Sequence, residues 1–296
     1  MNILVTGGSG FLGSHVINQL LKNGYRVINY DLKNNLYINK KCKFIKGNIL
    51  DYRKIDKILK KNKIKIIYHF AGLADIELSA KMPLKTARVN ILGTVNILDL
   101  SIKNSINKVI FSSSIYAISS NGGFYRCSKR ACEDFFEEYS KKYNLKFSIL
   151  RYGSLYGPNS DETNGIYKIL KDAVKKRKLE YIGNKKAQRR YIHVKDAAWA
   201  SIQILSNKFD NKYINLIGTK NYTINYIFNI VKKILKIDKS KKIHYLNNKF
   251  TGHYISKPNP LILEKGINFK FKKKKEVKIE NGLKEIIDIL KRWKNK

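Results

Sequence analysis

The feature that most constrains the fold is an apolar run, a set of glycines and a helical pattern at the start of the chain. Residues 2–6 form a short run typical of a strand, and residues 14–22 have helical spacing. Between them lie Gly7, Gly8, Gly10 and Gly13. Such glycines permit a tight turn, close approach of the backbone to phosphates, and close packing of helix on strand. The pattern predicts a dinucleotide site with phosphates at the positive helix end.

The next apolar segment supports this prediction and selects the cofactor. Residues 26–30 read RVINY, which is rich in strand-forming side chains, and Asp31 follows directly. An acidic residue about 20 positions after the glycines can accept hydrogen bonds from the hydroxyls of the adenine ribose. It therefore favours NAD over NADP. The alternative is a glycine-rich turn in another kind of α/β protein, which would not require Asp31.

The composition is that of a soluble globular protein. The 296 residues can form a substantial core. Because no apolar run approaches the roughly 18 residues of a membrane span, we expect no membrane association. The glycine loop begins at residue 7, which leaves no room for a signal peptide. Cys42, Cys127 and Cys132 have neither metal-site spacing nor an even count for disulfides. We therefore predict a cytoplasmic protein without a metal site.

The net charge of +38 raises the question of nucleic-acid binding. The lysines are spread along the whole chain, and no helix-turn-helix, zinc knuckle or aromatic RNA-binding motif accompanies them. We interpret the charge as solvated surface and expect no nucleic-acid partner. A positive field would still attract phosphorylated small substrates.

Strands and helices alternate through the first half of the chain. Strands are predicted at residues 43–46, 64–70 and 108–112, and helices at residues 52–63 and 86–102. This alternation predicts an α/β fold with a parallel, doubly wound sheet. Ligands of such sheets bind beyond the carboxyl ends of the strands. Ser112 lies at one of these ends.

A tyrosine and a lysine lie four residues apart on the next predicted helix, residues 124–143. Tyr125 and Lys129 therefore project from the same face. A neighbouring ammonium favours the phenolate and is expected to lower the pKa of Tyr125, which could then act as a general base. Ser112 could share a substrate hydroxyl with it. A chance Tyr-x-x-x-Lys is the alternative, and its position after a serine-ended strand argues against chance.

Several motifs together resemble the extended short-chain dehydrogenase/reductases, in particular the NAD-dependent nucleotide-sugar epimerases and dehydratases. The motifs are Thr6–Gly13, Asp31, His69–Gly72, Val89–Thr94, Phe111–Tyr116, Tyr125–Lys129, Leu150–Pro158 and Arg189–Asp196. The resemblance implies a Rossmann domain at residues 1–160 that carries the catalytic residues. It also implies a smaller α/β substrate-binding domain at residues 161–296, with a strand at 212–216 returning to the Rossmann sheet. A homodimer formed through residues 86–102 and 126–143 is a further expectation.

The resemblance also assigns roles to individual residues. Ser112, four positions before Tyr116 of the serine motif, takes the place of the catalytic hydroxyl. Tyr125 takes the place of the base, and Lys129 takes the place of the residue that binds the nicotinamide ribose. The cofactor-binding positions are Gly7, Gly10, Phe11, Leu12, Gly13, Asp31, Leu32, Asn48, Ile49, Phe70, Ala71, Gly72, Asn90, Tyr125, Lys129 and Tyr152. The substrate-binding positions are Ser113, Ser114, Ser154 and Arg189, of which Arg189 would contact the diphosphate.

Departures from the family pattern narrow the chemistry. Family dehydratases follow the catalytic hydroxyl with an Asp-Glu pair, and Ser113 and Ser114 stand here instead. The absence of a cysteine at Ser114 disfavours 3,5-epimerisation as well. Hydride transfer at C4 of a nucleotide-diphosphate sugar is left, either as 4-epimerisation or as a 4-dehydrogenase or 4-ketoreductase reaction. A noncatalytic NAD-binding or nucleic-acid-binding protein on the same fold is the more remote alternative.

Overall fold

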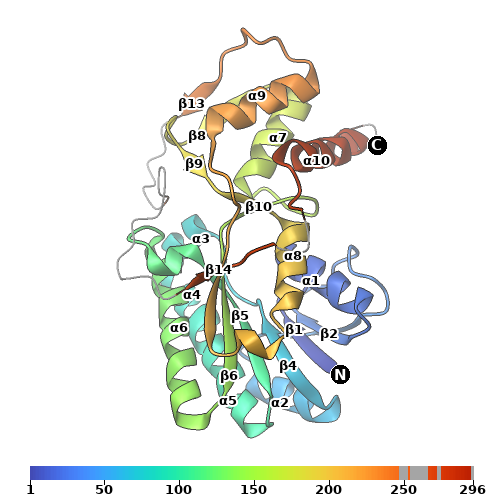
Figure 1. The fold of residues 1–296 in the computed structure, drawn as a ribbon, viewed down its shortest axis with the longest axis vertical. Coiled ribbons are helices and arrows are strands. Elements are labelled where there is room, and N and C mark those ends of the chain that lie inside the picture. Colours follow the sequence, from blue (N-terminus) through green and yellow to red (C-terminus); the bar gives the residue numbers. More distant parts are fainter. Residues whose placement is uncertain (247–252, 254–265, 272–274, 295–296) are drawn as a thin grey trace.

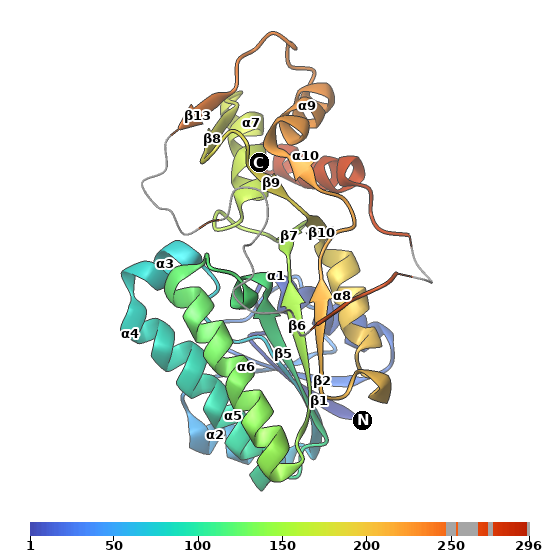
Figure 2. The same ribbon diagram turned by 60° about the vertical axis from the view of Figure 1, so that its left-hand side comes forward.

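A parallel sheet of eight strands organises the molecule (Figures 1 and 2). The computed structural model describes residues 1–246, 253, 266–271 and 275–294. In sheet order the strands are β14 (Ile267–Asn268), β11 (Lys212–Leu216), β6 (Lys146–Tyr152), β5 (Lys108–Ser114), β4 (Ile64–His69), β1 (Asn2–Thr6), β2 (Arg26–Asp31) and β3 (Lys43–Lys46). Every pairing in this sheet is parallel. The predicted doubly wound α/β fold is confirmed.

The strand order reverses between β1 and β4, which are neighbours in the sheet although β2 and β3 lie between them in the chain. Chain connections leave toward opposite faces at such a switch point, and a crevice opens above it. The strands beside it are almost continuously apolar and buried, as expected for a sheet covered on both faces. The glycine loop after β1 therefore faces the crevice.

Helices cover both faces of the sheet (Figure 2). On one face α2 (Tyr52–Lys61), α5 (Gly93–Lys103) and α6 (Gly123–Tyr143) pack their apolar side chains against the strands. On the other face α1 (Phe11–Lys22) packs against α8 (Val194–Gln203) in a second apolar cluster. Thus β11 and β14 from the second half of the chain extend the Rossmann sheet, and α8 covers part of one face.

A third apolar core lies beyond the carboxyl ends of the strands. It is formed by α7 (Gly165–Lys176), α9 (Ile224–Leu235) and α10 (Ile279–Lys294). Short strand pairs flank this core. They are β7 (Ser154–Tyr156) with β10 (Tyr191–His193), β9 (Gln188–Arg189) with β12 (Tyr222–Thr223), and β8 (Glu180–Ile182) with β13 (His244–Leu246). Residue 160, the predicted domain boundary, falls between β7 and α7.

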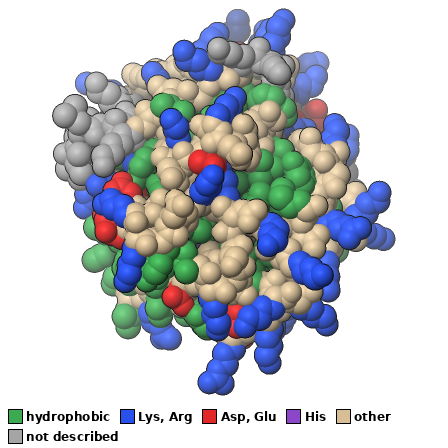
Figure 3. Space-filling model, turned by 60° about the horizontal axis from the view of Figure 1, so that its bottom comes forward, with side chains coloured by type: hydrophobic (Ala, Val, Ile, Leu, Met, Phe, Trp, Pro, Cys, Tyr) green, Lys and Arg blue, Asp and Glu red, His purple; other side chains and the backbone are tan. Residues whose placement is uncertain are grey.

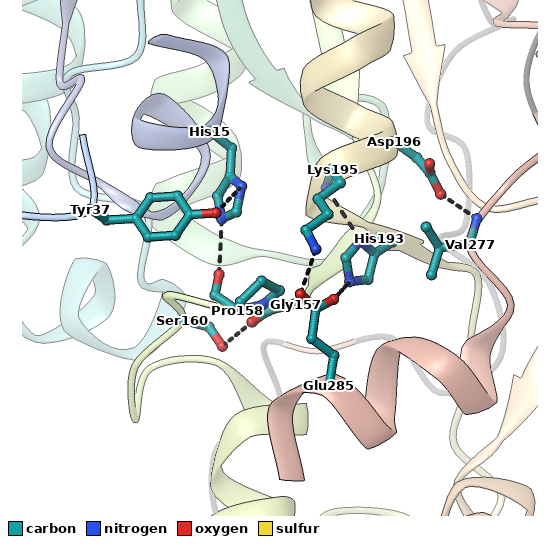
Figure 4. A network of polar contacts seen from close by, with 10 residues as sticks. All are labelled: His15, Tyr37, Gly157, Pro158, Ser160, His193, Lys195, Asp196, Val277 and Glu285. Atoms are coloured by element: carbon teal, nitrogen blue, oxygen red, sulfur yellow. Dashed lines mark hydrogen bonds and ion pairs between the residues drawn. The ribbon is translucent and has the colours of Figure 1, made fainter. Parts of the chain in front are cut away.

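A polar network joins α10 to the start of α8 (Figure 4). Glu285 of α10 pairs with Lys195 and lies with its Oε2 atom 3.5 Å from Nε2 of His193. Nearby, His15 of α1 contacts the carbonyl of Pro158 at 2.9 Å. We call these five residues the α8 network. It connects α1, the segment after β7, α8 and α10 at one place.

Most predicted elements agree with the structure, and two differ in ways that affect the site. The predicted helix 86–102 is interrupted, because residues Ala87–Leu92 form a π-helical turn between α4 (Pro83–Thr86) and α5. The predicted strand 108–112 continues to Ser114. The remaining short elements are α3 (Ile76–Lys81) and the 3₁₀ turns Ile115–Ile118 and Asn207–Phe209.

Figure 3 shows how the charged side chains lie on one face of the molecule. On the face in Figure 3, Lys and Arg side chains are scattered over the whole outline rather than gathered in one patch. Among the residues that the structure describes, no helix is both long enough and apolar enough to cross a membrane.

Candidate active site

A cavity of about 1700 Å³ lies above the switch point, between the carboxyl ends of the strands and the third core. It collects residues from distant parts of the chain. The predicted site residues that line it are Gly7, Gly10, Phe11, Leu12, Gly13, Asp31, Leu32, Asn48, Ile49, Phe70, Ala71, Gly72, Ser112, Ser113, Ser114, Tyr125, Tyr152, Ser154 and Arg189. Of the predicted set, Asn90 and Lys129 do not border the cavity and lie behind its wall.

The glycine loop is packed as its sequence predicts. Gly7 has φ of +69°, and a Cβ added there would lie 2.4 Å from the backbone nitrogen of Ala71, at the end of β4. A Cβ at Gly13 would lie 2.5 Å from the carbonyl oxygen of Gly7. Both positions therefore require glycine, one for the turn and one for helix packing. Gly10, the N-cap of α1, has no side chain to occupy the helix end.

Asp31 at the end of β2 is held with its carboxylate at the glycine loop. Its Oδ2 accepts a hydrogen bond from the Ser9 nitrogen at 2.9 Å, and its Oδ1 accepts one from the Leu32 nitrogen at 2.6 Å. Asn48 uses its side chain within its own loop, where it accepts from Leu50 at 3.0 Å. An uncapped helix end with an acidic residue beside it fits the diphosphate and adenine ribose of a dinucleotide.

Tyr125 and Lys129 lie on the buried face of α6, as predicted. The Lys129 Nζ atom donates to the carbonyl oxygen of Ser112 at 2.7 Å. It lies 4.7 Å from the ring centre of Phe111 and 5.9 Å from that of Tyr125. Burial lowers the pKa of the Lys129 ammonium. The structure thus brings Tyr125, Lys129 and the end of β5 together.

The hydroxyl of Ser114 forms a hydrogen bond with Tyr125. Burial raises the pKa of Tyr125, and a hydrogen bond with Ser114 opposes that rise. Ser114 Oγ also accepts a hydrogen bond from the Tyr116 nitrogen at 3.2 Å, so its proton is left to donate. Ser112 contributes its backbone carbonyl to Lys129 instead. This geometry favours Ser114 as the hydroxyl beside Tyr125, and the assignment of Ser112 as the catalytic hydroxyl stays a prediction.

The expected lowering of the Tyr125 pKa is also wrong for this structure. Burial of the phenol dominates and raises the pKa of Tyr125 to about 12. The Lys129 ammonium is directed to the Ser112 carbonyl and is not among the influences on this pKa. A phenolate at Tyr125 therefore requires positive charge beyond that of Lys129.

Ser113 borders the cavity, but its hydroxyl points to the opposite side of β5. It donates to Glu133 Oε1 at 2.5 Å, and only 3% of Ser113 is exposed. Successive side chains of a strand alternate between the two faces of the sheet, and Ser113 lies on the face where Glu133 of α6 packs. The Ser113 hydroxyl was predicted to contact the substrate, and in the structure it contacts Glu133.

Asn90 does not line the cavity but holds a loop that does. Its amide accepts from the Leu73 nitrogen at 2.7 Å and donates to the Leu73 carbonyl at 3.1 Å and to Ser128 at 2.9 Å. These bonds hold the loop that follows Gly72. Tyr152 lines the cavity, and its hydroxyl is bonded to Ser201 at 2.7 Å.

Tyr116 and His253 are lining residues outside the predicted set, and they contact each other. The Tyr116 hydroxyl lies 2.9 Å from Nδ1 of His253, and the Tyr116 ring meets that of Tyr125 edge to face at 6.5 Å. Tyr116 could have been found from the sequence, because it ends the motif Phe111–Tyr116. His253 belongs to no motif and could not. Arg189 of β9 also lines the cavity, and its Nη1 atom donates to the carbonyl oxygen of Gln188 at 2.7 Å.

Comparison with known proteins agrees with this geometry. The description "NAD dependent epimerase/dehydratase family" belongs to a family model that matches residues 3–218. The chain belongs to this family. A putative UDP-glucose 4-epimerase of Methanocaldococcus jannaschii is 30% identical over 78% of this chain and 81% of its own length. A UDP-glucuronate 4-epimerase of Thermodesulfobacterium geofontis is 28% identical over 96% and 94%.

A solved structure extends the likeness to almost the whole chain. The UDP-glucose 4-epimerase of Thermotoga maritima, crystallised with UDP-glucose, is 28% identical, covers 99% of both chains and superposes with a TM-score of 0.86. Membership of the epimerase/dehydratase family makes NAD the cofactor, as Asp31 and the glycine loop predicted.

Proposed function

We propose that the protein is an NAD-dependent 4-epimerase of a nucleotide-diphosphate sugar. The observation that carries this proposal is the convergence of Ser114, Tyr125 and Lys129 at the end of β5, beside a cavity that also contains Asp31 and Arg189. One end of the cavity fits the dinucleotide and the other offers a guanidinium for a diphosphate. A general base between the two would face the sugar.

Each residue has a role in moving the proton of the sugar C4 hydroxyl. The Ser114 oxygen accepts a hydrogen bond from the Tyr116 nitrogen, so its own proton is available to donate. Ser114 donates this proton between the sugar C4 oxygen and the Tyr125 hydroxyl. Tyr125 accepts the C4 hydroxyl proton and later returns it. NAD bound at the glycine loop supplies the hydride acceptor and, when oxidised, the additional positive charge that favours the Tyr125 phenolate.

Elimination chemistry is not supported. The two residues that follow Ser114 are Ile115 and Tyr116, so a catalytic hydroxyl at Ser114 would also lack the Asp-Glu pair of the dehydratases. An isoleucine cannot donate or accept a proton, and a leaving hydroxyl would find no acid there. The reaction is therefore confined to hydride transfer at C4.

The test is incubation of the purified enzyme and NAD with UDP-, GDP-, CDP- and dTDP-sugars, following NADH absorbance and the chromatography of the sugars. A sugar inverted at C4 without accumulated NADH supports the 4-epimerase. NADH together with a stable 4-keto sugar would instead make the protein a 4-dehydrogenase. Absence of both would contradict the proposal.

Three variants test the assignment of roles. Tyr125→Phe and Ser114→Ala each remove a group that handles the proton, and we expect each to lower kcat by about 10²–10⁴-fold. Ser112→Ala keeps the carbonyl that binds Lys129, so it should retain most of the turnover. Loss of activity in Ser112→Ala with normal activity in Ser114→Ala would instead identify Ser112 as the catalytic hydroxyl.

We also propose a cytoplasmic homodimer. The face formed by the π-helical turn, α5 and α6 exposes apolar side chains, including Leu92 at 48% and Phe135 at 39%. Burial of such side chains between two copies would stabilise a dimer. Light scattering of the native protein and of Phe135→Glu would test it, because a monomer in both would contradict the dimer.

A further inference from the structure

A buried carboxylate lies below the catalytic serines and takes no part in the reaction proposed above. Glu133 is 1% exposed and stands on α6 four residues after Lys129 and eight after Tyr125. This spacing places all three side chains on one face of the helix. Glu133 therefore reaches the sheet one turn further from the cavity than Lys129 does.

Glu133 binds two neighbouring strands at once. Its Oε1 accepts from Ser113 Oγ at 2.5 Å and from Arg151 Nε at 3.0 Å, and its Oε2 accepts from Arg151 Nη2 at 2.7 Å. Ser113 of β5 and Arg151 of β6 are partners in the strand register, so their side chains stand side by side on the same face. We call Ser113, Glu133 and Arg151 the serine clamp.

The serine clamp lies between the two contacts that build the catalytic centre. Ser112, immediately before Ser113, binds Lys129 through its carbonyl, and Ser114, immediately after it, acts on Tyr125. A shift of β5 along α6 would change both contacts together. Arg151 is itself fixed, since its guanidinium lies 4.4 Å from the ring centre of Tyr213 on β11.

We propose that Glu133 is a positioning residue that holds Ser114 and Lys129 in the arrangement needed for turnover. This inference rests on the proposed function. Misplacement of reacting groups by about 1 Å can cost on the order of 100-fold in rate without weakening substrate binding. The serine clamp is therefore expected to affect kcat and to leave KM and the affinity for NAD unchanged.

The charge of Glu133 gives a second readout. The charged and titratable groups facing Lys129 are Tyr125, Cys132 and Glu133 on α6 and His69 on β4. Burial lowers the pKa of Lys129, and Glu133 opposes that effect. Without the carboxylate, Lys129 loses its proton at lower pH, which would move the alkaline limb of the kcat profile to lower pH.

Three variants separate the effect of the length of the Glu133 side chain from the effect of its charge. Glu133→Gln keeps the shape and removes the charge, so kcat should fall between about 10-fold and 100-fold and the alkaline limb should move to lower pH. Glu133→Asp keeps the charge but cannot span Ser113 and Arg151, so kcat should fall while the alkaline limb stays in place. Ser113→Ala, a small change that should not prevent folding, removes only the bond to β5 and should lower kcat at constant KM.

The matched control is Glu137→Gln, one turn further along α6. Glu137 also bonds to a neighbouring strand, through the Tyr213 hydroxyl, and it stands one helical turn further from Lys129 than Glu133 does. It should lose stability without loss of kcat. Equal losses of kcat in Glu137→Gln and Glu133→Gln, unchanged kcat in Ser113→Ala, or a raised KM in Ser113→Ala would each overturn the proposal.

A crystal structure of Glu133→Gln provides a readout that does not depend on turnover. The Ser114 hydroxyl is expected to move away from Tyr125, and the dissociation constant of NAD is expected to stay unchanged. If the native enzyme converts no nucleotide sugar, the proposed function fails, while this displacement still tests the serine clamp. A Ser114 that keeps its place in the variant crystal would contradict the positioning role.

Discussion

The serine clamp and the α8 network are both polar, yet they differ in burial and in what they connect. In the serine clamp the side chains of Glu133 and Arg151 are each 2% exposed, and both belong to the Rossmann sheet and its helix. In the α8 network Glu285 and Lys195 are 32% and 44% exposed, and they join α10 to α8 (Figure 4). The comparison teaches that similar ion pairs can differ in cost and in consequence, because one is buried beside the serine segment and the other is partly solvated between two helices.

The largest difference should appear when one partner of each pair is removed. Arg151→Met leaves the Glu133 carboxylate buried and unpaired, which is expected to cost about 3–5 kcal/mol of unfolding free energy. Chemical denaturation of the native protein and the variant measures this loss. The double variant Glu133→Gln with Arg151→Met should recover much of it, because no buried charge then remains. A loss below about 1 kcal/mol would equate the serine clamp with a surface pair.

Acid should act through the α8 network rather than through the serine clamp. Burial lowers the pKa of His193 to about 4, below the ordinary value of 6.5. As pH falls, the unfolded chain binds the proton first, so stability is unaffected above pH 6.5 and is lost between 6.5 and 4. For this one histidine the loss reaches on the order of 3 kcal/mol at pH 4.

His193→Asn tests that expectation with little change to the fold. Asparagine can replace His193 as the cap of α8, where Nδ1 accepts from the Lys195 nitrogen at 3.3 Å. The variant should lose less stability than the native protein when both are unfolded at pH 7 and at pH 4. The pKa values of His15 and His69 are also lowered by burial, so part of the acid sensitivity should remain. Identical acid losses in both proteins would contradict the assignment.

Removal of charge from the exposed pair should have a smaller effect. Glu285→Gln is expected to cost at most about 1 kcal/mol, because water already solvates both partners in part. Thermal or denaturant unfolding beside Arg151→Met gives the comparison directly. A cost as large as that of the serine clamp would show that α10 depends on this contact for docking.

Salt should give the smallest effect and should separate the two pairs by screening. The coupling between Lys195 and Glu285 is expected to be a few tenths of a kcal/mol and to vanish near 1 M salt. The coupling between Arg151 and Glu133 should persist, since buried pairs are screened much less. Double-mutant cycles at low and high salt measure both values. Equal salt sensitivity would remove the distinction drawn from burial.

The sequence alone determined the cofactor half of the molecule. Gly7, Gly13 and Asp31 stand at fixed spacings along one βαβ unit, and each position follows from local geometry. The pairing of Tyr125 with Lys129 is equally local, because four residues make one turn of a helix. Alternation of strand and helix patterns was sufficient to predict the parallel sheet.

Tertiary structure alone decided which serine meets Tyr125, where α8 packs and what the pKa of Tyr125 is. The first depends on where β5 ends relative to α6, because Ser112 and Ser114 are two residues apart and local alternation places them on the same face of the strand. The serine clamp joins residues 18 to 20 positions apart, and His253 reaches Tyr116 across 137 positions. Such contacts follow from register and burial, which no local pattern in the chain encodes.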